Sequence, residues 1–139
     1  MGEAFPTKER IEALVRALEG SEAFRSASAG WGDGFNGNVL LVFDAEEGGQ
    51  PAVAVLLRLA GGRCLGAERV DGASHPEAGF VFRARRSVWG DLMSGKTDPT
   101  SAAMSGQLTV EGNYLLLLRY AKLAPVLVSC VSEAGLSLD

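Results

Sequence analysis

The first regular pattern of apolar positions along the chain is helical. Its members are Ile11, Leu14, Val15 and Leu18. They occupy positions i, i+3, i+4 and i+7, which share one face of a helix. Thr7 precedes the run, and its hydroxyl can accept a free N–H group of the first turn. The pattern predicts an amphipathic helix that covers a core.

The next segment, residues 26–38, is rich in Gly, Ser, Ala and Asn, which predicts a loop. Trp31 and Phe35 are the large aromatic residues of this loop. Exposing such side chains is costly, so we expect both to fold back onto the body of the protein.

The pattern then changes to the short runs and the alternation of β-strands. Residues 39–43 form a compact apolar run, and residues 53–59 carry apolar side chains at every second position. Gly61 and Gly62 tolerate the positive φ angles of a two-residue hairpin loop, which predicts a third strand over residues 63–70, paired with the second. Residues 80–82 make a fourth short strand.

Two short helices are predicted after the fourth strand. Apolar residues within 88–93 fall on one helical face, and Gly95 stands where a left-handed residue ends such a helix. Asp98 and Pro99 form a second start signal, because the carboxylate accepts free N–H groups while proline fills the first position without losing a donor. This helix is expected to end before Gly106.

A fifth strand and a terminal helix complete the pattern. Leu108 and Val110 alternate with polar residues, Asn113 can cap a helix that begins at Tyr114, and Pro125 should kink or end it. Strands and helices are thus segregated in the α+β manner. With 139 residues and 47% hydrophobic content, we expect one domain, residues 1–139.

Charge, cysteine usage and hydropathy exclude several classes of partner. Lys and Arg number 13 against 17 acidic residues, so the net charge is -4 and the basic footprint of a nucleic-acid-binding protein is missing. The apolar stretch 114–131 is interrupted by two cations and a proline, which predicts a buried helix rather than a membrane span. Polar residues 7–10 follow the first few residues directly, so we expect no signal peptide and a cytoplasmic protein.

The sequence contains no catalytic or metal-binding constellation. Cys64 and Cys130 lie far apart without a CxxC pair, and His75 is the only histidine, so neither a zinc site nor any cofactor is predicted. His75 stands in a polar loop, where a surface histidine is expected rather than a general base. The glycine-rich residues 30–34 lack the lysine and the strand-loop-helix context of a phosphate loop. We therefore expect a protein that is not an enzyme.

The stretch 89–113 carries a more specific signal. It resembles the signature of sterol carrier protein 2 (SCP2-like) domains, in which a helix, a GK turn, a Pro-capped short helix, a glycine-opened strand and a closing helix follow one another. The residues that match this pattern are Lys96, Pro99, Ala102, Gly106, Leu108 and Gly112. The expected order of elements agrees along nearly the whole chain, although Ser105 stands where many members carry glutamine.

The resemblance implies a five-stranded, curved mixed sheet covered by helices, with an internal apolar cavity for fatty-acyl chains or sterols. It also implies which side chains form the ligand-binding wall: Trp89, Leu92, Met93, Met104, Leu108, Val110, Leu115 and Leu118. The pattern of residues 114–118 alone favours plain core packing.

Other positions are candidates for the mouth of such a cavity. Trp31 and Phe35 are either a lid or an ordinary anchored loop. Tyr120 is a candidate head-group contact through its hydroxyl. Arg83 and Arg85, in a basic cluster, are candidates for an anionic head group, with a solvated strand edge as the alternative.

The function that these features predict is that of a carrier for a hydrophobic small molecule: a fatty acid, an acyl-CoA or a sterol-like compound. Two alternatives remain at the level of sequence. One is a non-catalytic accessory or subunit-contact domain of an enzyme system. The other is a homo-oligomeric structural protein in which Trp31, Phe35 or the C-terminal Leu136 and Leu138 insert into a neighbour.

Overall fold

The computed structural model describes residues 5–45 and 51–135. The strands of this part are β1 (Val39–Asp44), β2 (Val53–Ala60), β3 (Arg63–Asp71), β4 (Phe80–Arg85) and β5 (Thr109–Glu111). The helices are α1 (Lys8–Glu19), α2 (Glu22–Ala27), α3 (Arg86–Ser94), α4 (Pro99–Met104), α5 (Tyr114–Arg119) and α6 (Leu123–Glu133). None of these helices is long and apolar enough to cross a membrane.

Within the described residues the strands form one mixed, open sheet in the order β3-β2-β1-β4-β5. β1 runs parallel to β4, and all other neighbours are antiparallel. Gly61 and Gly62 have φ angles of 56° and 81°, which confirms the predicted tight hairpin between β2 and β3. The α+β fold with a five-stranded mixed sheet is therefore as the sequence predicts.

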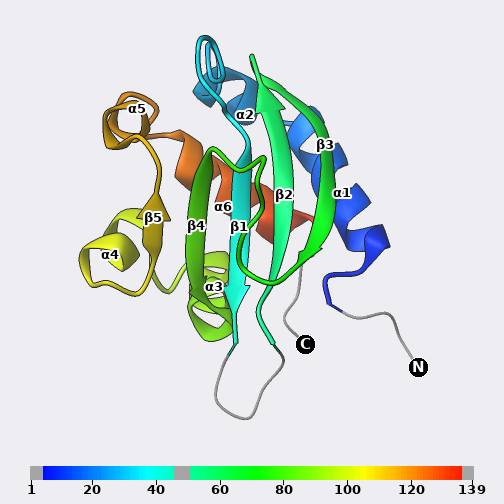
Figure 1. Ribbon diagram of the computed structural model, residues 1–139, viewed down its shortest axis with the longest axis vertical. Helices are drawn as coiled ribbons and strands as arrows, with labels where there is room; N and C mark the ends of the chain where they lie inside the picture. The colour runs from blue at the N-terminus through cyan, green and yellow to red at the C-terminus, as the bar shows by residue number, and fades with distance from the viewer. Residues whose placement is uncertain (1–4, 46–50, 136–139) are drawn as a thin grey trace.

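The helices cover one face of this sheet and build the main core there. Figure 1 shows α1, α3 and α6 behind the strands, while α4 and α5 lie beyond the β4–β5 edge. Leu41, Val55 and Phe82 stand at paired positions on β1, β2 and β4, and all three belong to this core. α6 contributes Leu127 and Val131, both almost fully buried.

The opposite face is covered as well, although no helix lies on it in the described residues. Its centre consists of Leu40, Val42, Ala54 and Leu56, each 0% exposed. The segment 72–79 crosses this face between β3 and β4 (Figure 1), and Ala73 and Ala78 pack against the four side chains. Burial on both faces explains why residues 39–43 of β1 and residues 53–57 of β2 are apolar at every position.

The predicted helix ends are largely confirmed. Thr7, Asp98 and Asn113 each accept hydrogen bonds from N–H groups of the first helical turn, and Gly95 ends α3 with φ 82°. α2 was not predicted. Its sequence is short, and its Ser21 cap precedes a segment with one core residue, Phe24, so it carries little helical periodicity.

The predicted terminal helix is two helices, and the break does not lie at Pro125. α5 ends at Arg119 and α6 begins at Leu123. Pro125 lies in the first turn of α6, where a backbone N–H would have no partner within the helix. Proline is tolerated at this position, so the kink falls at residues 120–122 instead.

Candidate functional site

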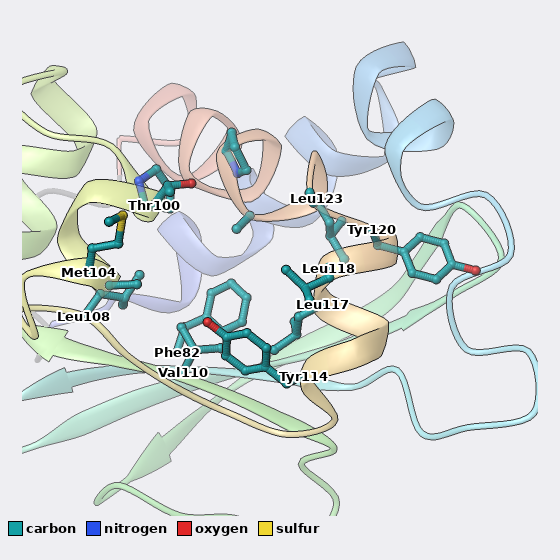
Figure 2. Close-up of a pocket in the computed structure, with 15 residues that line it drawn as sticks. Phe82, Thr100, Met104, Leu108, Val110, Tyr114, Leu117, Leu118, Tyr120 and Leu123 are labelled. Atoms are coloured by element: carbon teal, nitrogen blue, oxygen red, sulfur yellow. The ribbon is translucent and has the colours of Figure 1, made fainter.

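An apolar pocket of about 370 Å³ lies beyond the β4–β5 edge of the sheet. α4, β5, α5 and the first turn of α6 surround it, and β4 contributes one aromatic ring. Its main apolar wall consists of Phe82, Leu108, Val110, Leu117, Leu118 and Leu123. Figure 2 shows these side chains converging from both sides of the hollow.

Strand register and a helix cap position this wall. Val110 of β5 stands opposite Phe82 of β4, so both side chains point to the helix-covered side of the sheet. Asn113 then starts α5 by accepting N–H groups of Leu115 and Leu116 through its side-chain oxygen. The resulting helix presents positions 114, 117 and 118 to the pocket, an i, i+3, i+4 set.

The pocket is suited to an apolar guest. None of its lining residues carries a charged side chain, and the polar side-chain groups among them are the hydroxyls of Thr100, Tyr114 and Tyr120. The pocket opens to solvent, because Met104, Tyr114 and Leu118 at its border are 84%, 64% and 62% exposed. The enclosed cavity that the family resemblance implies stays a prediction, and the pocket described here is open at this border.

Four of the predicted wall residues line the pocket: Met104, Leu108, Val110 and Leu118. Leu115 does not. It is 77% exposed and lies on the outer face of α5, directly after Tyr114 in the chain. In a run of four leucines the helical period cannot indicate which face turns inward.

The other three predicted wall residues lie away from the pocket. Trp89 is a core residue: its indole Nε1–H donates to the Val42 carbonyl at 2.8 Å, and its ring lies 5.0 Å from that of Phe43. Leu92 and Met93 border a separate depression between α3 and α6. Pro99 and Pro125 line both hollows and separate the two.

Trp31 and Phe35 form an anchored loop instead of a free lid. Trp31 is 0% exposed, and its Nε1–H donates to the Gly37 carbonyl at 2.7 Å. Its ring packs against Phe35, Phe80 and Tyr120 at centroid distances of 5.1, 4.7 and 5.1 Å. A side chain buried within its own chain is not available for insertion into a neighbour, which removes Trp31 from the proposed oligomer contact. Leu136 and Leu138, the C-terminal residues proposed for the same contact, lie outside the described residues.

The candidate head-group contacts point away from the hollow. Tyr120 is one of the lining residues, but its side chain points away from the hollow, and its hydroxyl is directed toward the loop at Gly30 (Figure 2). Arg83 and Arg85 alternate with Phe82 along β4 and therefore lie on the opposite face of the sheet. Arg83 Nε donates to Asp44 at 2.8 Å, and Arg85 is exposed.

Several lining residues were missed at the level of sequence. They are Phe82, Pro99, Thr100, Ala103, Tyr114, Leu117, Ala121, Leu123, Ala124 and Pro125. Tyr114 and Leu117 lie on the same helical face as Leu118. This spacing could have indicated them, but in a run of leucines it does not identify one face. Phe82 comes from a strand distant in the chain, and only the β4–β5 register brings it to the pocket.

A second cluster of chemistry-bearing groups lies on the other face of the sheet. Ligand atoms of Glu68, His75 and Glu77 lie within 4.8 Å of one another. The Arg58 guanidinium already bridges the two carboxylates, and His75 Nδ1 accepts the N–H of Glu77 at 3.0 Å. A cation would compete with Arg58 for the same oxygens, so the cluster fits an ion-pair network that holds the segment 72–79 down.

Both cysteines are buried and free of disulfide bonds. Burial raises the pKa of the Cys64 thiol, and it raises the pKa of Cys130 as well. Thiols with raised pKa carry little of the reactive thiolate at neutral pH. Both side chains therefore act as small apolar packing groups.

Comparison with known proteins identifies the family to which this fold and pocket belong. The model of the SCP-2 sterol transfer family matches residues 33–125. A crystal structure of sterol carrier protein 2 is 35% identical, with a TM-score of 0.81 over 94% of this chain and 98% of that one. A conserved hypothetical protein of Thermus thermophilus, described as possibly a sterol carrier protein, is 32% identical, with a TM-score of 0.78 over 96% of this chain and 91% of that one.

A more distant solved structure shares the fold alone. Sterol carrier protein 2 of Yarrowia lipolytica in its apo form is 14% identical, with a TM-score of 0.56 over 95% of this chain and 96% of that one. No curated protein matches the chain. The family match covers most of the chain and includes the β4–β5 edge and the pocket elements up to Pro125. The chain therefore belongs to the SCP-2 sterol transfer family.

Proposed function

We propose that the protein is a non-catalytic carrier that holds one lipid-like molecule in the pocket between α4, β5, α5 and α6. The observation that carries this proposal is a hollow of about 370 Å³ without a charged lining side chain. Transfer of each methylene from water to such a site contributes about 0.8 kcal/mol. The membership of the SCP-2 family and the similarity to a sterol carrier protein support the same role.

The chemistry of the wall supports a fatty-acyl or sterol-like ligand whose buried part is uncharged. A charged group in this hollow would lose its hydration without gaining a partner, which is costly. The hydroxyls of Thr100 and Tyr114 provide hydrogen bonds for one neutral polar group. The carboxylate of a fatty acid or the head of an acyl-CoA would therefore remain outside the mouth.

The proposal is tested by measuring ligand binding to the purified protein. Native mass spectrometry should show a co-purified hydrophobic molecule, or fatty acids and sterols should raise the melting temperature, because a ligand that binds only the folded state stabilises it. A methyl ester should bind at least as tightly as the free fatty acid. If no such compound binds, the carrier function is wrong.

A filled-pocket variant locates the binding site. Ala103→Phe places a ring in the hollow from α4, and we expect it to weaken binding at least tenfold. Ala23→Phe makes the same change at an exposed position on α2, another six-residue helix, and should bind as the unmodified protein does. Equal binding by both variants would show that the ligand occupies another site.

A further inference from the structure

Exposed apolar side chains gather at the mouth of the pocket. Among the described residues the exposed large hydrophobic side chains are Leu65, Met104, Tyr114, Leu115 and Leu118. All of these except Leu65 belong to α4 or α5, and α5 buries none of its own residues. We call the four side chains together with Arg119 and Lys122 the α4–α5 rim. Contiguous exposed apolar surface of this kind marks an interaction site.

The charge of the rim is opposite to that of the protein. The sequence 112–132 contains no Asp or Glu, and its charged residues are Arg119 and Lys122, both exposed, in a chain of net charge -4. Glu111 precedes this stretch, but it alternates with Val110 and so faces the other side of the sheet, toward Arg83. The Asp98 carboxylate is held at the start of α4 by the N–H and hydroxyl of Ser101.

Resting on the carrier function proposed above, we propose that the α4–α5 rim docks on an anionic lipid bilayer. Leu115 and its apolar neighbours enter the boundary between head groups and acyl chains, while the two cations contact lipid phosphates. The pocket mouth then faces the membrane, so an apolar guest passes between bilayer and pocket without crossing water. A second copy is a poorer occupant, because a two-fold contact through this rim would bring four cations into one apolar interface.

A substitution at Leu115 tests the docking surface without changing the pocket. Leu115 is 77% exposed and does not line the hollow, so Leu115→Ser changes the rim and leaves the wall intact. Leu65 is 66% exposed on β3, remote from the rim, which makes Leu65→Ser the matched control. The charges are tested with the double variant Arg119→Gln/Lys122→Gln. Its control is the double variant Arg16→Gln/Arg85→Gln, which removes two exposed cations on α1 and β4.

The experiment is flotation of the full chain with vesicles of phosphatidylcholine alone and with added phosphatidylserine. We expect binding to the anionic vesicles, at least tenfold weaker binding to the neutral ones, and weakening by salt. Each cation near an anionic surface contributes about fivefold in affinity, so the double charge variant should lose about 25-fold. Leu115→Ser should lose at least fivefold, and both control variants should bind normally.

Other outcomes overturn the proposal in distinguishable ways. Equal binding to neutral and anionic vesicles, or unchanged binding of the rim variants, means that the rim is not the docking surface. A dimer in size-exclusion chromatography that Leu115→Ser dissociates means that a second copy covers the rim. Fatty-acid and sterol binding by the same variants is measured without vesicles. If ligands bind the pocket but the protein does not bind vesicles, the docking proposal is wrong and the carrier function is unaffected. If the protein binds vesicles but no ligand binds the pocket, only the carrier function is wrong.

Discussion

At the scale of single residues, the loop beside the pocket is held by a close approach of backbone and ring. A Cβ at Gly37 would lie 2.7 Å from the indole of Trp31, so only glycine lets the ring reach the Gly37 carbonyl. Trp31 in turn packs against the ring of Tyr120, which is one of the pocket-lining residues. A loop distant in sequence from the pocket elements is therefore in contact with one of them.

Gly37→Ala is expected to destabilise the protein by about 1–3 kcal/mol, since the indole must move and its hydrogen bond is weakened or lost. Urea unfolding followed by far-ultraviolet circular dichroism measures this change. Gly20→Ala is the control, because its Cβ would meet only the Arg16 carbonyl at 3.2 Å and its φ is an ordinary -87°. Equal stability of the two variants would contradict the proposed role of Gly37.

At the scale of elements, α5 depends on its cap more than on its packing. The helix has six residues and buries none of them, whereas the Asn113 side chain accepts two of its free N–H groups. A helix of this length is unstable by itself in water. Removal of the cap should therefore loosen the pocket wall formed by Leu117 and Leu118.

Asn113→Ala should lower the stability of the protein by about 1 kcal/mol and speed amide hydrogen exchange in α5. Asn113→Asp retains an acceptor at the same place and should stay close to the unmodified protein. Binding of an apolar ligand to the alanine variant should weaken as well. Exchange that is unchanged in α5 would show that packing, and not the cap, holds the helix.

At the scale of the whole molecule, one carboxylate ties the end of α1 to the β2–β3 hairpin. Glu19 accepts hydrogen bonds from Arg63 Nη2 at 2.8 Å and from the Cys64 N–H at 3.1 Å. These bonds favour the charged form, and the Arg63 bond is the main reason why the pKa of Glu19 is lowered. The folded state therefore binds a proton at this site less readily than the unfolded chain does.

The sign of the pH dependence follows from this lowered pKa. The stabilisation is complete above the ordinary pKa of a glutamate, about 4.3, and is lost as the pH falls through the lower pKa of the folded state. In urea unfolding between pH 6 and pH 3, Glu19→Gln should be less stable than the unmodified protein at pH 6 and approach it at pH 3. Glu12→Gln, an exposed position on the same helix, should follow the unmodified protein throughout.

The sequence alone determined the features that depend on neighbours along the chain. The caps at Thr7, Asp98 and Asn113, the hairpin glycines and the alternating strand over residues 53–59 are local, and the structure confirms them. The family signature in residues 89–113 likewise lies in one continuous stretch. Local chemistry was therefore enough for the fold class, and four of the eight residues of the expected wall line the apolar pocket.

Only the tertiary structure decided which apolar side chains meet the pocket and which fill the core. Every position from 115 to 118 is leucine, so the sequence does not indicate the inward face of α5. In the structure Leu116 and Leu117 pack against the core, and Leu117 and Leu118 line the pocket. Trp89 belongs to the core, where the Val42 carbonyl on β1 accepts its N–H. The hydrophobic effect acts on buried area without direction, so a pattern of apolar residues predicts burial, whereas the partner comes from the packing of distant elements.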